Sequence, residues 1–256
     1  MFIAINIGNT NTYAGFFMKE EPFVRRMPTH PLKSAAEYIL EMERELEKYG
    51  FPERPDAAAL CSVVPSHNEV FLEVLGMILG KKAKKPLVIS HETVSGMTFD
   101  IENPAALGAD RIAASYGAWK LLGGPVCAVD MGTATTVNFV TSSGLFLGGA
   151  ILPGIGLMRN SLQSSTAMLP YTDLDHPPPS GPIGTNTSGS ILSGIIHGTA
   201  GAVSRIVEEA EMERLTKFKV ALTGGCADLA APYLKRLDFH EPALVLKGMR
   251  LIHLKA

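Results

Sequence analysis

The sequence carries one short pattern twice, about half the chain apart, and this repeat limits the folds that it can adopt. Ile5-Asn6-Ile7-Gly8-Asn9-Thr10 can be laid over Val129-Asp130-Met131-Gly132-Thr133-Ala134. Each copy has an apolar strand, one polar residue, a glycine turn containing threonine and then a second apolar run, as in a β-hairpin. The repetition predicts two related halves that each open with a strand–turn–strand unit. Chance similarity over six residues is the alternative.

The two glycine turns are candidate phosphate-binding loops. A tight loop of small residues leaves backbone N–H groups able to converge on an anion, and threonine hydroxyls add further donors. Two such loops facing each other would hold the phosphates of a nucleotide, while the acid Asp130 at a strand end would hold a metal ion. Ordinary hairpin turns are the simpler interpretation, because Asn-Thr and Gly-Thr are common turn residues. The repetition of the unit, once with an acid, favours the nucleotide hypothesis.

Composition and charge exclude several classes of protein. The 256 residues, 46% of them hydrophobic and 19% charged, suffice for one large globular domain or for two compact halves with cores of their own. A net charge of -2 without charged blocks favours neither nucleic acid nor an anionic membrane surface as a partner. The three cysteines are widely spaced and predict neither a zinc site nor a disulfide framework. The apolar N-terminus is too short to span a bilayer, so we expect a cytoplasmic protein that binds no membrane.

Periodic apolar residues predict helices between the strands. Ser34-Ala35-Ala36-Glu37 has the spacing of a capping box, and the periodic run after it extends to Tyr49. Further helices are expected over residues 68–79, 109–122, 188–215 and 245–254, and buried strands over residues 57–64, 126–130 and 220–222. Strands and helices thus alternate along the chain, as in an α/β protein.

Three more segments contain candidate site residues. In Gly108-Ala109-Asp110-Arg111, Asp110 could accept a proton from a substrate hydroxyl and Arg111 could orient a carboxylate or phosphate. An acid at a helix start is also electrostatically favourable in any protein. Thr223-Gly224-Gly225 would let a backbone approach a flat ring, as at an adenosine site. Ile183-Gly184-Thr185-Asn186-Thr187 caps the long helix and could contact a ligand.

Taken in order, these motifs resemble the type III pantothenate kinases, a family of the actin-like ATPase and acetate and sugar kinase superfamily. The resemblance covers nearly the whole chain. The motifs that carry it are Gly8-Asn9-Thr10, Ser62-Val63-Val64-Pro65, Glu102-Asn103-Pro104, Gly108-Ala109-Asp110-Arg111, Asp130-Met131-Gly132-Thr133-Ala134-Thr135-Thr136, Gly148-Gly149, Pro153-Gly154, Thr166-Ala167-Met168-Leu169-Pro170, Gly184-Thr185-Asn186-Thr187, Ser193-Gly194 and Thr223-Gly224-Gly225.

The resemblance implies a fold and an activity. The α/β fold would be two duplicated ribonuclease-H-like domains of the actin-like ATPase type, with mixed sheets flanked by helices, at residues 1–116 and 117–256. The activity would be transfer of the γ-phosphoryl group of ATP to the primary hydroxyl of pantothenate, which gives 4'-phosphopantothenate in the first step of coenzyme A biosynthesis. Magnesium, a monovalent cation (potassium or ammonium) and a homodimer are implied as well.

Carried over by position, the resemblance also implies roles for single residues. Asp110 would be the catalytic base and Asp130 would bind the monovalent cation. Because phosphoryl transfer depends mainly on alignment and charge neutralisation, an Asp110 with an ordinary pKa would suffice. Pantothenate would be contacted by Ile101, Gly108, Ala109, Asp110, Arg111 and Thr187. ATP would be contacted by Asn6, Gly8, Asn9, Thr10, Asn11, Thr12, Thr133, Gly224 and Gly225.

Three positions depart from the family's usual motifs. Asn6 stands where the family usually has aspartate, Ile101 where it has tyrosine, and Thr185 where it often has lysine. An amide offers an oxygen to a metal ion but no charge, and losing about 2.7 kcal/mol of charge neutralisation would slow the reaction about a hundredfold. Two other hypotheses therefore stay open. One is a catalytically impaired relative that binds nucleotide in a regulatory role, and the other is a kinase or phosphatase for another small molecule.

Overall fold

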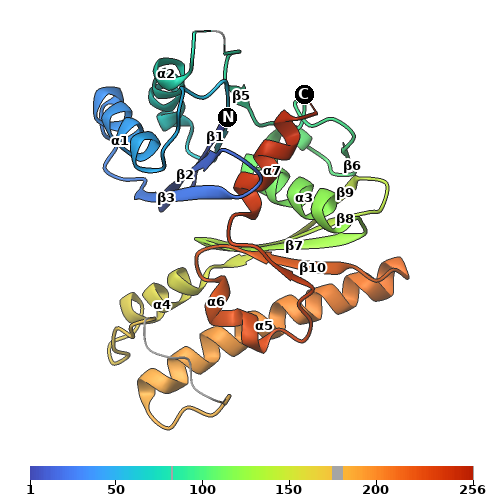
Figure 1. Ribbon diagram of the computed structural model, residues 1–256. Coiled ribbons are helices and arrows are strands. Elements are labelled where there is room, and N and C mark those ends of the chain that lie inside the picture. Colours follow the sequence, from blue (N-terminus) through green and yellow to red (C-terminus); the bar gives the residue numbers. More distant parts are fainter. Residues whose placement is uncertain (82, 175–180, 256) are drawn as a thin grey trace. The chain divides into compact units, whose positions relative to one another are not determined.

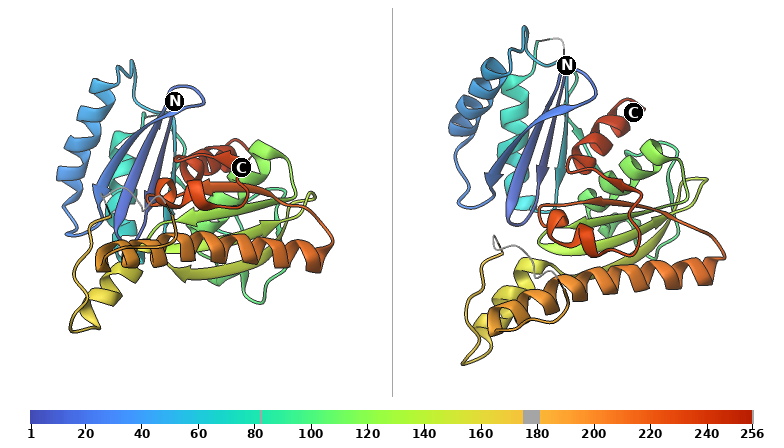
Figure 2. Two further views of the ribbon diagram at one scale, coloured as in Figure 1. Left: turned by 90° about the horizontal axis from the view of Figure 1, so that it is seen from below. Right: turned by 60° about the horizontal axis from the view of Figure 1, so that its bottom comes forward.

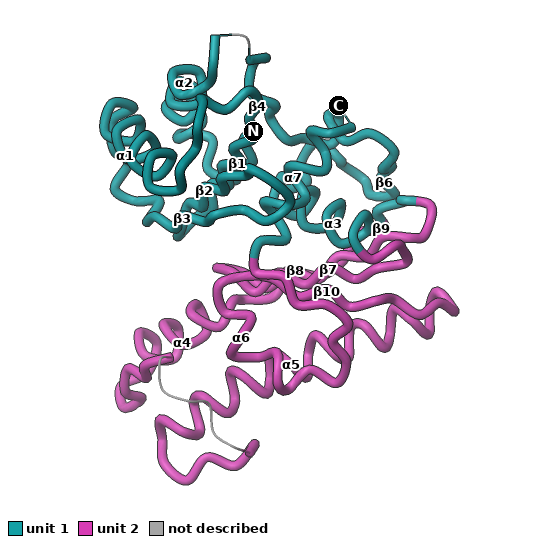
Figure 3. The backbone as a smooth tube through the Cα atoms, in the orientation of Figure 1, with its two compact units in different colours: residues 1–121, 144–146, 243–256 teal, residues 122–143, 147–242 magenta. Residues whose placement is uncertain are grey.

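The computed structural model describes residues 1–81, 83–174 and 181–255. Two compact units make up the chain, coloured separately in Figure 3. Unit 1 comprises Met1–Leu121, Gly144–Phe146 and Ala243–Ala256, and unit 2 comprises Leu122–Ser143 and Leu147–Pro242. Neither unit is one continuous stretch of sequence, whereas the domains expected at residues 1–116 and 117–256 are; that division stays a prediction.

Unit 1 is built on a five-stranded sheet with the strand order β3-β2-β1-β4-β5 (Figure 1). Strand β1 is antiparallel to β2 and parallel to β4. The elements of the unit are β1 (Phe2–Ile7), β2 (Asn11–Phe17), β3 (Pro22–Pro28), α1 (Ala35–Lys48), β4 (Ala57–Ser62), η1 (Pro65–His67), α2 (Asn68–Ile78), β5 (Leu87–Val88), β6 (Thr98–Phe99), η2 (Pro104–Ala106), α3 (Ala109–Leu122) and α7 (Leu244–His253).

Helices cover both faces of this sheet because β1 is apolar on both sides (Figure 2). Alternate side chains of a strand point to opposite faces, so Ile3, Ile5 and Ile7 all join the core that α1 and α2 close. On the other face, the Phe2 ring stacks on His253 of α7, with 5.0 Å between the ring centroids. Helix α1 begins at the predicted capping box, in which Ser34 and Glu37 bond to each other's backbone N–H.

Helices α3 and α7 contact each other through their backbones. A Cβ on Gly248 would lie 1.9 Å from the carbonyl oxygen of Ala113, and one on Gly117 would lie 2.9 Å from that of Leu244. Only glycine permits so close an approach at both positions. Together with the packing of α7 against β1 and β4, this contact joins the C-terminal helix to unit 1.

Unit 2 holds most of a second sheet, whose strand order is β11-β10-β7-β8-β9-β6. Strand β6 of unit 1 pairs with Leu145 and Phe146 at the start of β9. Side chains of α4, α5 and α6 pack with β7, β8 and β10 into one core. The elements are β7 (Val126–Met131), β8 (Ala134–Val140), β9 (Leu145–Pro153), α4 (Ile155–Ser164), α5 (Thr187–Arg214), β10 (Lys219–Thr223), α6 (Ala227–Ala230), η3 (Ala231–Tyr233) and β11 (Phe239–His240).

The structure confirms the internal repeat. The order β3-β2-β1-β4-β5 recurs as β9-β8-β7-β10-β11, and β1 and β7 show the same succession of buried residues, as do β2 and β8. Ile7 pairs with Thr12 in the first hairpin, and Met131 pairs with Thr135 in the second. The α/β fold with duplicated mixed sheets is therefore as the sequence predicts.

Helix α5 is long and apolar enough to span a membrane by length and composition, the one such helix among the described residues. Half of its most apolar window is buried. Ile191, Ile195, Val203 and Val207 of this helix belong to the core of unit 2. Packing within the unit thus accounts for the buried half of this window.

Candidate active site

The first glycine turn closes the β1–β2 hairpin in unit 1. The N–H of Gly8 donates to the carbonyl oxygen of Asn11 over 3.0 Å, and a Cβ on Gly8 would lie 3.0 Å from the same oxygen. Asn9 and Thr10 at the tip are exposed. The turn is therefore tight and accessible, as a phosphate-binding loop must be.

Asn6 lies directly before this turn, on the penultimate residue of β1. It pairs with Tyr13 on one side and Cys61 on the other. Its Oδ1 atom is buried and has no hydrogen-bond partner among the described residues. A buried polar atom without a partner costs about 1–3 kcal/mol, so this amide oxygen is suited to a ligand or an ordered water.

The second glycine turn closes the β7–β8 hairpin in unit 2. The N–H of Gly132 donates to the carbonyl oxygen of Ala134 over 3.0 Å, and the N–H of Gly154 donates to the carbonyl oxygen of Thr133 over 3.1 Å. A Cβ on Gly154 would lie 2.2 Å from that oxygen, so the β9–α4 junction packs directly beneath the turn. Thr133 itself is exposed.

Asp130 and Gly224 meet beside this second turn. Asp130 is half-buried and pairs with Thr223 of the parallel strand β10. Gly224 follows with a φ of +105°, and a Cβ there would lie 2.5 Å from Asp130 Oδ1. Asp130, Thr133, Gly224 and Gly225 therefore gather where β7 and β10 end, the edge at which open α/β sheets bind ligands.

The Asp110 loop lies beside the end of β4 in unit 1. A Cβ on Gly108 would lie 3.6 Å from Val63 Cγ1, and Val63 N–H donates to the Ile7 carbonyl oxygen over 3.0 Å. Unit 1 thus brings the start of α3 and the end of β1 to the same edge of the sheet, with Val63 between them. The sequence motifs include both segments but do not predict this contact between them.

Asp110 is a carboxylate in a desolvated setting at the first turn of α3. Its Oδ1 accepts the N–H of Arg111 over 2.7 Å, and the same oxygen leaves no room for a Cβ on Gly108. Burial raises the pKa of Asp110, and the Arg111 N–H and charge oppose this rise only in part. The pKa of Asp110 is therefore not the ordinary one that the sequence leads us to expect.

Arg111 extends from the same turn toward an aromatic ring. Its Cζ lies 5.9 Å from the centroid of Phe146, within the range of a cation–π contact. Burial lowers the pKa of Arg111, opposed by the charge of Asp110. An arginine remains charged in spite of such a shift, so it presents a desolvated cation next to the carboxylate.

The remaining predicted residues lie in separate segments. Ile101 is half-buried between β6 and η2 in unit 1. Thr187 is exposed and begins α5 in unit 2, where Asn186 Oδ1 accepts the N–H of Gly189 over 2.8 Å. The Asn186 cap confirms the predicted helix start. The predicted residues therefore divide between the two units, with Asp130, Thr133, Thr187, Gly224 and Gly225 in unit 2.

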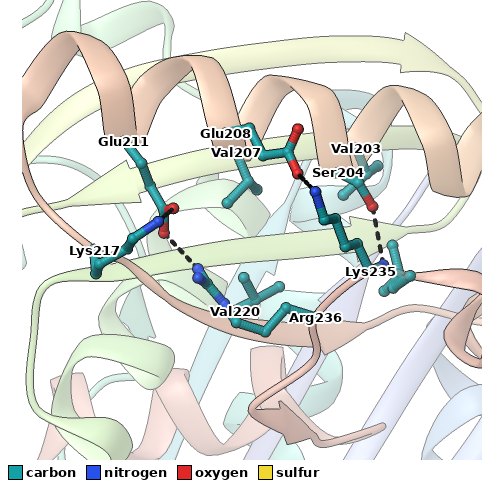
Figure 4. Close-up of a pocket in the computed structure, with 10 residues that line it drawn as sticks. Val203, Ser204, Val207, Glu208, Glu211, Lys217, Val220, Lys235 and Arg236 are labelled. Carbon is teal, nitrogen blue, oxygen red and sulfur yellow. Dashed lines mark hydrogen bonds and ion pairs between the residues drawn. The ribbon is translucent and has the colours of Figure 1, made fainter.

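A cavity of about 310 Å³ in unit 2 contains none of the predicted residues. It lies between α5 and residues 234–236 (Figure 4), and Val203, Val207 and Val220 are among the residues that line it. Glu208 pairs with Lys235, and Glu211 pairs with both Lys217 and Arg236, so the charged side chains that line the cavity are engaged with one another. This cavity is a packing feature of the unit and not the candidate site.

Comparison with known proteins identifies the family. The family model for type III pantothenate kinase matches residues 2–209. A type III pantothenate kinase from Moorella thermoacetica is 36% identical over 255 residues, which cover 99% of this chain and 98% of that protein. One from Roseiflexus sp. shows the same identity and coverage.

Solved structures give the fold. A Baf family transcriptional activator from Campylobacter jejuni superposes with a TM-score of 0.57 at 20% identity, covering 99% of this chain and 98% of that one. Component A of (R)-2-hydroxyglutaryl-CoA dehydratase from Acidaminococcus fermentans also gives 0.57, at 14% identity, covering 100% and 96%. The fold is that of the actin-like ATPases and sugar kinases. By its family match and its full-length relatives, the chain belongs to the type III pantothenate kinase family.

Proposed function

We propose that this chain transfers the γ-phosphoryl group of ATP to the primary hydroxyl of pantothenate, giving 4'-phosphopantothenate for coenzyme A biosynthesis. The observation that carries the proposal is the placement of Asp110. This carboxylate lies on the first turn of α3, beside the strand end from which the Gly8 turn departs. The names of full-length relatives support pantothenate as the substrate.

Asp110 acts as the base in the proposed reaction. The substrate oxygen bonds to the γ-phosphorus of ATP, the bond from that phosphorus to ADP breaks, and the hydroxyl proton passes to the Asp110 carboxylate. The transition state of phosphoryl transfer is loose, so the proton moves late and alignment contributes most. The raised pKa of Asp110 strengthens the ionised carboxylate as a proton acceptor.

Arg111 orients the substrate in this proposal. A guanidinium group binds a carboxylate through two parallel hydrogen bonds, and pantothenate carries one carboxylate. Arg111 is half-buried, so its charge is poorly screened by water. Gly108, Ala109, Ile101 and Thr187 are proposed to complete the contacts with pantothenate.

The residues of both glycine turns are proposed to contact the ATP phosphates, and Gly224 and Gly225 the adenosine. The oxygens present also fit the expected cations. Magnesium in kinases is held largely by phosphate oxygens and water with one or two protein oxygens, and when bound it would neutralise charge on the transferred group. Asp130 provides an acid for a cation, and Asn6 provides a buried amide oxygen without a partner among the described residues. No cluster of three or more His, Cys, Asp or Glu side chains suited to a metal occurs in the described part of the chain.

The same proposal includes potassium or ammonium at Asp130, a homodimer and a location in the cytoplasm. Dimerisation rests on the family resemblance alone. The burial of much of α5 within unit 2 supports a protein that works without a membrane.

A coupled ADP-release assay tests the proposal. It is run with saturating ATP, magnesium and potassium, with and without pantothenate, on the wild type, Asp110→Asn and Asn6→Asp. We expect pantothenate-dependent turnover by the wild type. Asp110→Asn should lose turnover at least a hundredfold while its affinity for ATP changes no more than a few fold, because the amide keeps the shape and removes the base.

Asn6→Asp separates the two main hypotheses. If the missing negative charge at this position limits the rate, the variant should turn over up to about a hundredfold faster than the wild type. Turnover by Asn6→Asp alone would instead identify the natural chain as a catalytically impaired relative. Absence of pantothenate-dependent turnover in both proteins would reject the proposed function.

A further inference from the structure

Thr29 is the centre of a hydrogen-bond cluster beneath the Gly8–Thr12 turn. Its N–H donates to the Thr10 carbonyl oxygen over 3.0 Å, and its hydroxyl donates to the Gly8 carbonyl oxygen over 2.7 Å. Because a hydroxyl has one proton, Thr29 Oγ1 must accept from Thr12 Oγ1, which lies 3.1 Å away. Thr29 is fully buried, and it bonds to three of the five residues of the turn.

His67 holds Thr29 from the opposite side. Its Nε2 lies 3.2 Å from the Thr29 carbonyl oxygen, and since a carbonyl only accepts, Nε2 must carry a proton. Ser66 Oγ lies 3.1 Å from the other ring nitrogen, Nδ1. His67 is 3% exposed and precedes α2 directly, so Thr29 is tied to the start of a helix.

The second half of the chain shows that a hairpin of this kind does not require the threonine hydroxyl. There the bond from Gly154 N–H to the Thr133 carbonyl oxygen takes the place of the bond from Thr29 to Thr10. The second turn is one residue shorter than the first, and Thr135 corresponds to Thr12 because each pairs with the last residue of the preceding strand. Gly154 has no side chain, and the Oγ1 of Thr135 is buried without a partner among the described residues. The hydroxyl cluster is therefore an addition particular to the first turn.

The bond to Gly8 also fixes the direction of a donor. The carbonyl of Gly8 and the N–H of Asn9 belong to one planar trans peptide, so they point in opposite directions. With the carbonyl held inward by the buried Thr29, the Asn9 N–H is directed away from the core at an exposed residue. A fixed outward N–H at a turn is the element from which anion sites are made.

We propose that Thr29 is a positioning residue of the nucleotide site: its hydroxyl, supported by His67, sets the Gly8 peptide so that the Asn9 N–H faces a phosphate of ATP. The inference rests on the proposed function, because it requires that the Gly8–Thr12 turn binds nucleotide. Thr29 touches neither nucleotide nor substrate and acts through the turn.

The test measures binding of a non-hydrolysable ATP analogue by titration calorimetry, together with the KM for each substrate. Thr29→Val keeps the shape and removes the hydroxyl, and Thr29→Ser keeps the hydroxyl. A net hydrogen bond contributes about 1 kcal/mol, so Thr29→Val should raise the Kd for the analogue about fivefold, whereas Thr29→Ser should stay within about twofold. The KM for ATP should follow the Kd, and the KM for pantothenate should not change.

Thr199→Val is the matched control. Thr199 is also a buried threonine, and its hydroxyl donates to the Ile195 carbonyl oxygen over 2.7 Å within α5 of unit 2. This variant should have a lowered melting temperature like Thr29→Val but the nucleotide affinity of the wild type. Should Thr29→Val fail to fold, His67→Gln and His67→Leu replace it, since glutamine retains a donor and leucine does not. We expect weakened analogue binding in His67→Leu alone.

The outcomes separate the two proposals. A wild-type protein that does not bind the ATP analogue refutes the proposed function and this inference together. A wild type that binds, with an unchanged Kd in the Thr29→Val or His67→Leu variant, overturns the inference and leaves the proposed function standing. An equal loss of affinity for the analogue in Thr199→Val would also overturn the inference, because the weaker binding would then follow from lowered stability.

Discussion

Glu211 offers a stability prediction whose size follows from its surroundings. It lies on α5 and is 6% exposed. Burial alone would raise the pKa of Glu211, but hydrogen bonds from Arg236, Lys217 and the N–H of Phe218 outweigh burial and lower that pKa from 4.5 to about 2. The three donor–acceptor distances are 2.5, 2.5 and 3.0 Å.

The sign and size of the contribution of Glu211 to the free energy of unfolding follow from proton linkage. The folded state holds the Glu211 proton less tightly than the unfolded state, so the stabilisation is fully present above pH 4.5 and is lost as pH falls toward about 2. The difference, 4.5 minus about 2, corresponds to about 3.4 kcal/mol at 1.36 kcal/mol per pKa unit. Lys217 is 82% exposed and Arg236 is 38% exposed, so water screens part of this attraction and we expect about 2 kcal/mol.

Urea unfolding of the wild type, Glu211→Gln and Glu213→Gln at pH 7 and pH 3 measures this contribution. Glu213 lies on the same helix but is 72% exposed, so it serves as the control. Glu211→Gln should lower the free energy of unfolding by about 2 kcal/mol at pH 7 and by clearly less at pH 3, while Glu213→Gln stays within about 0.5 kcal/mol of the wild type. A pH dependence of Glu211→Gln equal to that of the wild type would refute the reasoning.

Three further predictions follow from the site and its supports. Because the base must be ionised, log kcat/KM should fall with unit slope as the pH drops below the pKa of Asp110, which burial raises above its ordinary value of 3.8. A flat acid limb in the pH–rate profile would contradict this. Gly224→Ala should destabilise the protein by about 1–3 kcal/mol and weaken nucleotide binding, because its φ is +105° and its Cβ would meet Asp130; thermal melts and analogue titration measure both effects. Ser34→Ala should cost about 1 kcal/mol in urea unfolding through loss of the capping box without changing kcat, and an unchanged stability would count against that box.

The elements that the sequence predicts well are those whose signals are local. The repeat of strand, glycine turn and strand predicts both hairpins, and α1 and α3 begin where a capping box and an acidic first turn indicate. Strand β3 and helix α4 are not predicted. Strand β3 lies at a sheet edge with most of its side chains exposed or half-buried, so it lacks the apolar alternation that marks a strand.

For the site, motifs predict the residues on turns and helix starts, but not the residues that support them. Asp110, Asp130 and the glycine turns lie within short, recognisable patterns. Thr29 and His67 belong to no such pattern, because 38 residues separate them and only the folded sheet brings them together. The internal repeat is the one sequence feature that bears on them, because each of the two hairpins needs a residue that supports its turn.

The attachment of α7 to unit 1 has a consequence for how the chain is made. Helix α7, near the C-terminus, covers one face of the sheet whose first strand is β1, and both belong to unit 1 (Figure 3). Helix α3 also packs against α7, through Gly117 and Gly248. A ribosome releases the N-terminal strands first and α7 more than 200 residues later. The apolar face that ends in Phe2 and Phe17 therefore stays uncovered while unit 2 is synthesised, and it is the surface that a nascent-chain chaperone would have to shield.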